Sequence, residues 1–128
     1  SDSGDPPAPI SKFKHMRFPP AIIKGLAAKK IKYPTPIQMQ AMPTVLSGRD
    51  CIGIAYTGSG KTLVFALPMI MFALEEQLKM PLIFGEGPIG IIICPSRELA
   101  SQTYDNVCHF TKYLEMDGWP KLNSLLCM

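Results

Sequence analysis

The sequence predicts an α/β fold, in which an open parallel sheet is flanked by helices. Two short apolar runs rich in β-branched residues, 51–55 and 89–94, are typical of buried parallel strands. Each run is followed by a segment with helical character, the first from about Gly60 to Lys79 and the second from near Ser96–Glu98 to about Leu114. Strand, helix, strand, helix in this order is a βαβ unit, which predicts a parallel sheet. Because two strands make only part of such a sheet, we expect this to be the first part of a domain.

Upstream of this unit, the sequence predicts a Pro-rich lead-in and two helices. Residues 1–12 are polar and rich in Pro, so we expect them to be flexible and the domain to span 13–128. A helix is predicted from Pro19 or Pro20 to about Lys30. A second follows, with Thr35 as its N-cap and Pro36 at its first position. We expect Pro43 to kink or interrupt it and Gly48 to end the segment.

Composition limits the class of protein. With 128 residues, 47% hydrophobic and 18% charged, the chain can form one domain or part of a larger one. Its four cysteines form no CxxC pair, which disfavours a zinc site or a disulfide framework. The longest apolar run, 63–74, is shorter than the roughly 20 residues that a membrane span needs. We therefore expect a soluble intracellular protein without a membrane segment, and a monomer.

Positive charge is concentrated in the N-terminal part of the chain. The formal net charge is only +3, yet residues 6–49 contain no Asp or Glu. The basic residues of this stretch are Lys12, Lys14, Arg17, Lys24, Lys29, Lys30, Lys32 and Arg49. Such a distribution favours polyanionic ligands such as nucleotides or nucleic acid, and a solvated basic face is the alternative.

The strongest motif lies between the first predicted strand and the helix after it. It reads Ala55-Tyr56-Thr57-Gly58-Ser59-Gly60-Lys61-Thr62. Strand, Gly-rich loop and helix are the context of a phosphate-binding P-loop, in which backbone N–H groups and the helix N-terminus attract phosphate. Lys61 then places a cation on the β- and γ-phosphates, and the Thr62 hydroxyl can ligate Mg²⁺. Ala55 occupies the position of the first glycine, so the loop does not require a positive φ there.

Three motifs together resemble those of DEAD-box RNA helicases. Pro34-Thr35-Pro36-Ile37-Gln38, with Phe13 upstream, is similar to the Q motif. Residues 55–62 resemble the family's variant P-loop, and Pro95-Ser96-Arg97-Glu98-Leu99-Ala100, with Gln102 after it, resembles motif Ia. The resemblance covers about residues 13–102 and is strongest to the Abstrakt subgroup. It implies that the chain is part of a first RecA-like P-loop domain.

The resemblance also implies the roles of individual residues. Gln38 is expected to read the adenine edge and Phe13 to stack on the base. With residues 55–62 they form the expected ATP site, in which Lys61 and Thr62 are catalytic and Thr62 binds Mg²⁺. Pro95, Ser96, Arg97 and Glu98 are expected to contact the RNA backbone, independently of its sequence.

Three positions depart from the family pattern. Lys30 stands where the family usually has Gly, and Ile31 replaces the aromatic residue after it. Because of these two changes, the family pattern does not predict the conformation of the turn before the Q motif. Ser96 replaces the commoner Thr and keeps the hydroxyl group.

The complete function that the resemblance implies is RNA-dependent ATP hydrolysis, which drives duplex unwinding or ribonucleoprotein remodelling. Hydrolysis needs a metal-holding acid and transition-state arginines, which such helicases take from an Asp-Glu-Ala-Asp motif and a second RecA-like domain. The acids after motif Ia, Asp105, Glu115 and Asp117, do not form that motif, so we expect this chain alone to be inactive. Subgroup analogy implies a nuclear protein with spliceosomal or other ribonucleoprotein partners. A different P-loop NTPase and a non-catalytic, nucleotide-dependent RNA- or protein-binding module remain as alternatives.

Overall fold

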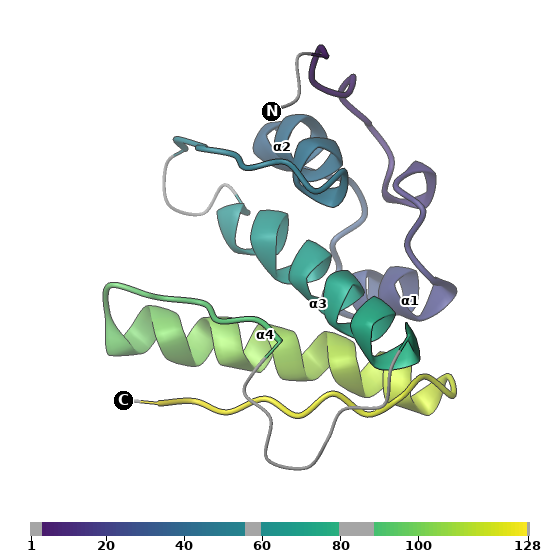
Figure 1. Cartoon of the computed structure of the whole chain (residues 1–128), viewed down its shortest axis with the longest axis vertical. Coiled ribbons are helices and arrows are strands. Elements are labelled where there is room, and N and C mark those ends of the chain that lie inside the picture. The colour runs from purple at the N-terminus through teal and green to yellow at the C-terminus, as the bar shows by residue number, and fades with distance from the viewer. Residues whose placement is uncertain (1–3, 56–59, 80–88, 128) are drawn as a thin grey trace.

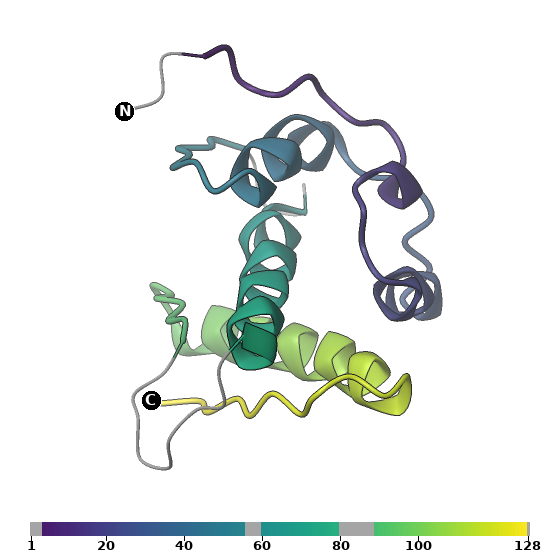
Figure 2. The ribbon, with the colours of Figure 1, turned by 45° about the vertical axis from the view of Figure 1, so that its right-hand side comes forward.

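In the computed structural model, residues 4–55, 60–79 and 89–127 are described, and within them the regular structure is helical. The helices are η1 (Phe13–His15), α1 (Pro20–Ala28), α2 (Pro36–Leu46), α3 (Lys61–Lys79) and α4 (Arg97–Met116). α3 lies at the centre, with α2 packed on one side and α4 on the other (Figure 1). α1 packs on α4, and the N-terminal segment runs past η1 on the same side of the molecule (Figure 2).

The starts of the helices follow from residues that the sequence places there. Pro20 stands in the first turn of α1, where its missing N–H costs nothing. Thr35 is the N-cap of α2 and Pro36 its first residue, as predicted. Ser96 is the N-cap of α4, and its Oγ accepts a hydrogen bond from the Leu99 N–H at 3.2 Å. The predicted starts of the four α-helices are thus confirmed to within a few residues.

The backbone at the end of α1 shows what it costs to have Lys30 where the family pattern has glycine. The Lys30 N–H donates to the Ala27 carbonyl at 2.9 Å, and the Ile31 N–H donates to the Leu26 carbonyl at 2.9 Å. This is the hydrogen-bond pattern of a Schellman turn, whose first residue after the cap takes a left-handed conformation. Lys30 has φ 61°, a conformation that costs a non-glycine residue roughly 1–2 kcal/mol. A glycine would adopt it without that cost, and Gly48, with φ 86°, does so after α2.

Of the two effects predicted for Pro43, a kink or an interruption of α2, the interruption does not occur. The helix continues to Leu46 with Pro43 buried inside it. Because proline has no N–H, it leaves the carbonyl of residue i−4, Met39, without its helical donor. That carbonyl accepts a hydrogen bond from the Ile10 N–H at 3.0 Å. The proline therefore frees an acceptor with which α2 holds the N-terminal segment.

A single hydrophobic core joins the helices. It contains Phe13, Met16, Phe18, Ala21, Ile22, Leu26, Ala41, Met42, Leu63, Val64, Leu67, Ile70, Leu74, Phe110 and Leu114. α1 and α4 meet most closely at Gly25, where a Cβ atom would lie 2.8 Å from the Phe110 Cδ1. The His109 Nε2 lies 2.8 Å from the Gly25 carbonyl oxygen, which adds a polar link at the same crossing.

The two predicted strands do not form a sheet within the described residues. Segments 51–55 and 89–94 carry no ladder hydrogen bonds and are classed as irregular. Ile52 and Ile54 are 95% and 93% exposed, and Ile93 is 90% exposed. A strand satisfies its backbone groups only through neighbouring strands, and an isolated pair is marginal in water. The sheet therefore stays a prediction, whereas the helices that would flank it are present.

Candidate nucleotide site

The Gln38 side chain joins the start of α2 to the residue before α3. Its Oε1 accepts from the Thr35 N–H at 2.9 Å, and the Gln38 N–H donates to the Thr35 Oγ1 at 3.5 Å. These two bonds form a capping box, for which the Thr-x-x-Gln spacing of residues 35–38 is the sequence signal. The remaining group, Nε2, donates to the Gly60 carbonyl at 3.1 Å. Gln38 is 2% exposed, so its buried amide is satisfied at both ends.

Gly60 occupies a position that a side chain would not fit. Its φ of 88° is in the region that favours glycine. A Cβ atom there would overlap the Gln38 Nε2 and lie 3.2 Å from the Thr35 Oγ1. The last glycine of the P-loop motif thus lets the chain pass directly against the capping box of α2. Ala55, at the other end of the motif, is half-buried, and Tyr56, Thr57, Gly58 and Ser59 lie outside the described residues.

Lys61 and Thr62 begin α3, immediately after Gly60. The Lys61 side chain is exposed and Thr62 is half-buried. α3 extends over 19 residues to Lys79, so its aligned peptide dipoles give its first turn a positive potential. An ammonium group and a hydroxyl group at this end are the groups expected for binding phosphate and a phosphate-bound cation.

Phe13 lies in the core rather than at a surface. It is 5% exposed and belongs to the cluster that includes Met16 and Phe18. The structure therefore shows Phe13 as an anchor that holds η1 on the helices. Its expected role in stacking on the base stays a prediction, and that role would require a different environment for the ring.

Residues 95–98 lie at the other end of the molecule from η1, where α4 begins (Figure 1). Pro95, Ser96, Arg97 and Glu98 are all exposed. The Ser96 hydroxyl caps the helix, and Glu98 stands in its first turn, where a carboxylate suits the helix dipole. Arg97 is the cation of this group, so an anion that approaches the helix end meets one positive side chain and one negative one.

Two hollows border these elements. A pocket of about 160 Å³ lies between α2, the start of α3 and the segment near Cys51, and it is lined by Lys61, Ile37, Val45, Val64 and Phe65 among others. It is smaller than usual ligand pockets. A larger hollow of about 910 Å³ lies between α3, α4 and the segments 89–94 and 121–127. Apolar groups dominate its lining and Lys61 is not among them, so we assign it to incomplete packing rather than to a phosphate site.

The described residues bring together no group of three or more His, Cys, Asp or Glu side chains that could hold a metal ion. The Thr62 hydroxyl, in the first turn of α3, is an oxygen ligand of the kind that Mg²⁺ accepts, and its role in binding the ion stays a prediction. Among the described helices, none is both long and apolar enough to cross a lipid bilayer.

Comparison with known proteins finds a family match over the part of the chain that contains the P-loop motif and residues 95–98. Residues 35–122 match the family model described as DEAD/DEAH box helicase. This match covers more than half of the chain and contains the P-loop motif and residues 95–98. The chain belongs to the DEAD/DEAH box helicase family.

Individual relatives show how much of a DEAD-box helicase is present. The chain is 59% identical to "ATP-dependent RNA helicase abstrakt" of Drosophila melanogaster, over 96% of this chain and 20% of that protein. It is 45% identical to "Pre-mRNA-processing ATP-dependent RNA helicase PRP5" of Meyerozyma guilliermondii, over 88% of this chain and 13% of that protein. It thus spans about a fifth or less of these relatives.

A solved structure gives the fold of a relative. The crystal structure of the RNA helicase Prp28 from Chaetomium thermophilum bound to ADP superposes with a TM-score of 0.77 at 33% identity. The match covers 88% of this chain and 26% of that one. The chain therefore corresponds to part of the N-terminal RecA-like domain of a DEAD-box helicase.

Proposed function

We propose that this chain binds ATP at the N-terminus of α3, as the first part of an RNA helicase motor. The contact from Gln38 to the Gly60 carbonyl carries the proposal, because it fixes the P-loop glycine against α2 directly before Lys61. Lys61 then neutralises phosphate charge where the helix dipole is also favourable. The Gln38 amide stands beside this position and is the candidate for reading the adenine edge, for which it would have to exchange its bonds to Thr35 and Gly60 for bonds to the base.

Mg²⁺ has a defined place in this proposal. The Thr62 hydroxyl would hold the ion together with phosphate oxygens and water, and the ion would supply charge neutralisation for phosphoryl transfer. Lys61 would orient the phosphates from the adjacent position.

The start of α4 is the proposed RNA contact. Free N–H groups of its first turn and the Arg97 guanidinium favour a phosphate group, and such contacts are independent of base sequence. In the complete protein, we propose RNA-dependent ATP hydrolysis that unwinds duplexes or remodels ribonucleoproteins. A parallel sheet that includes 51–55 and 89–94 would bury their exposed isoleucines. The pre-mRNA-processing relative supports a nuclear role with spliceosomal partners.

Replacing Lys61 tests the nucleotide site. Lys61→Ala removes one charge-assisted contact, which is expected to weaken Mg-ATP binding by about 1.5–3 kcal/mol, or about 10- to 140-fold. Isothermal titration of the protein with Mg-ATP measures this change. Lys79→Ala is the matched control, because it removes the same side chain at the opposite end of α3. Equal affinities of the Lys61→Ala and Lys79→Ala variants would refute the assignment.

The chain by itself is expected to show no RNA-stimulated ATP turnover. Asp105 and Glu115 lie along α4, and no acidic cluster of the described residues accompanies Thr62. Phosphoryl transfer depends on positioning and charge stabilisation, which a P-loop alone does not complete. Phosphate release with saturating single-stranded RNA is the assay, and the Lys61→Ala variant is the background. Turnover that requires both RNA and Lys61 would show that the catalytic groups lie within this chain.

A further inference from the structure

Three cations lie in η1 or within two residues of it, and we call them the N-terminal basic edge: Lys12, Lys14 and Arg17. All three side chains are exposed. They alternate with Phe13 and Met16, which are both 5% exposed and belong to the core. The apolar residues therefore fix this segment to the helices, while the charged residues between them are presented to solvent.

The backbone of this edge is ordered by its own hydrogen bonds. The His15 N–H donates to the Lys12 carbonyl and the Met16 N–H to the Phe13 carbonyl, both at 3.0 Å. Arg17 has φ 65°, a left-handed conformation with a cost of roughly 1–2 kcal/mol for such a residue. Backbone strain of this kind is concentrated at functional positions. A charged residue whose backbone is already ordered loses less conformational freedom when it binds a ligand than one on a free chain.

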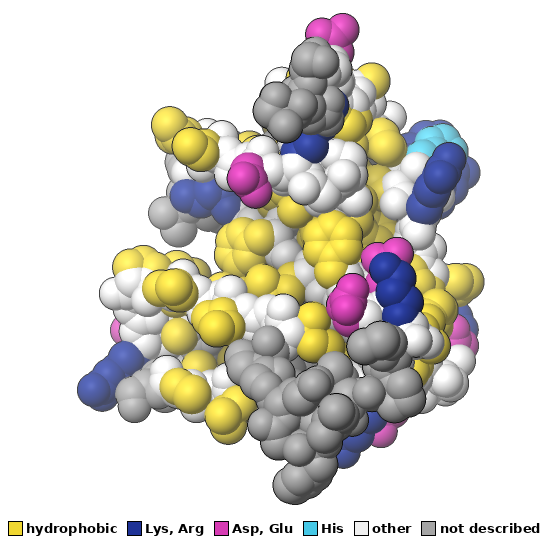
Figure 3. Space-filling model, in the orientation of Figure 1, with side chains coloured by type: hydrophobic (Ala, Val, Ile, Leu, Met, Phe, Trp, Pro, Cys, Tyr) yellow, Lys and Arg dark blue, Asp and Glu magenta, His cyan; other side chains and the backbone are white. Residues whose placement is uncertain are grey.

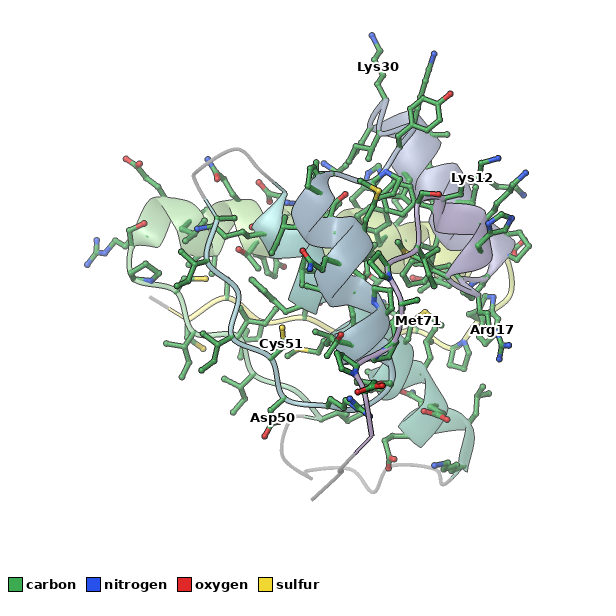
Figure 4. All side chains as sticks on the ribbon, turned by 90° about the horizontal axis from the view of Figure 1, so that it is seen from above. Lys12, Arg17, Lys30, Asp50, Cys51 and Met71 are labelled. Carbon is green, nitrogen blue, oxygen red and sulfur yellow. The ribbon has the colours of Figure 1, made fainter. Side chains whose placement is uncertain are left out.

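No acidic side chain neutralises the basic edge within the described residues. Lys, Arg and His side chains gather at the upper right of Figure 3, and no Asp or Glu lies among them. Asp50, the first acid after the stretch 6–49, lies on the far side of α2 from Lys12 and Arg17 (Figure 4). In the part of the chain that the structure describes, none of the three cations forms an ion pair.

We infer that the N-terminal basic edge binds the phosphate backbone of a single-stranded nucleic acid. Uncompensated cations on a fixed surface attract a polyanion, and phosphate contacts need no base recognition. The edge is at the opposite end of the molecule from the start of α4, so it is a second contact, separate from the one at Arg97 (Figure 1). The inference extends the RNA-binding part of the proposed function and rests on it.

The salt dependence of binding tests this inference. The triple variant Lys12→Ala, Lys14→Ala, Arg17→Ala is compared with the triple variant Lys79→Ala, Lys112→Ala, Lys121→Ala. Both lose three exposed cations, so their net charges are equal. Fluorescence anisotropy with a labelled 20-nucleotide oligouridylate, between 50 and 200 mM salt, gives the Kd of each protein. Thermal unfolding followed by circular dichroism checks that both variants are folded.

A phosphate contact releases counterions, with a slope of about 0.7 per contact for single strands. Loss of three contacts should therefore reduce the slope of log Kd against log salt by about 2 and weaken binding at 50 mM salt at least about ten-fold. The control triple variant should keep the wild-type slope. Equal losses in the two triple variants, or a wild-type protein without salt-dependent binding, would overturn the inference.

Two further measurements distinguish the possible causes of a loss of binding. Arg97→Ala should lower the slope of log Kd against log salt by about 0.7, both in the wild-type protein and in the edge triple variant. A missing effect of Arg97→Ala would count against the proposed contact at α4, and a missing effect of the edge triple variant would count against the basic edge. A deoxyoligonucleotide of equal length should lose affinity in the edge variant as the RNA does, which supports a phosphate contact. An effect restricted to RNA would assign the edge to the 2′-hydroxyl group and overturn the phosphate assignment.

Discussion

Gly60→Ala is expected to lower the free energy of unfolding by about 2–5 kcal/mol and to remove measurable Mg-ATP binding with it. Two effects add. The left-handed backbone at φ 88° costs an alanine roughly 1–2 kcal/mol. Its Cβ would also overlap the Gln38 Nε2, and overpacking of this kind costs about 1–3 kcal/mol. The displaced amide belongs to the capping box of α2, so the change also disturbs the end of α3 that carries Lys61.

Gly48 provides the matched control. It has φ 86°, nearly the same conformation, but no atom lies within 4 Å of a Cβ added there. Gly48→Ala should therefore show only the backbone cost and leave Mg-ATP affinity unchanged. In a Gln38→Ala background, Gly60→Ala should cost about as little as Gly48→Ala does. Urea denaturation and ATP titration of the wild type, the three single variants and the double variant measure these differences, and equal losses for Gly60→Ala and Gly48→Ala would contradict the proposed contact.

Phe110→Ala is expected to destabilise the protein by about 3–5 kcal/mol, the usual cost of deleting a buried aromatic ring. Its side chain is fully buried where α4 crosses α1. The glycine opposite, Gly25, has no side chain with which to fill the cavity that remains. Because Arg97 is the first residue of α4, loosening of this crossing should also weaken the RNA binding that we propose there.

Phe72→Ala is the control for Phe110. Phe72 is 37% exposed on α3, so its loss should cost much less. Thermal and urea unfolding give both values. A destabilisation of the two variants by the same amount would show that the α1–α4 crossing is not a main element of the core.

The sequence by itself determined where the helices lie and where most of them begin. Thr35-Pro36, Ser96 and Gly48 act through their own backbone or a neighbour three residues away, so their effects are local and can be read in order along the chain. The family assignment also came from the sequence, because the motifs around Gln38, Lys61 and Arg97 have a fixed order and context.

The tertiary structure decided the contacts between segments that are distant in the chain. Gln38 and Gly60 are 22 residues apart, and nothing local predicts that the amide of one donates to the carbonyl of the other. Pro43 was expected to kink or interrupt α2, but the helix continues through it, and the Met39 carbonyl that it frees is satisfied by Ile10 from the N-terminal segment. The burial of Phe13 likewise depends on helices that follow it in the chain.

The predicted sheet also depends on contacts between distant segments, which the local sequence does not specify. The apolar pattern of 51–55 and 89–94 indicates what those residues can do, since β-branched residues suit a buried strand. Whether they do so depends on partners for their backbone N–H and C=O groups, and within the described residues neither segment has such a partner. A helix closes its hydrogen bonds within itself, whereas a strand closes them only with another strand. For this reason the local sequence was enough to predict the helices of this protein, whereas the pairing of its predicted strands depends on tertiary structure.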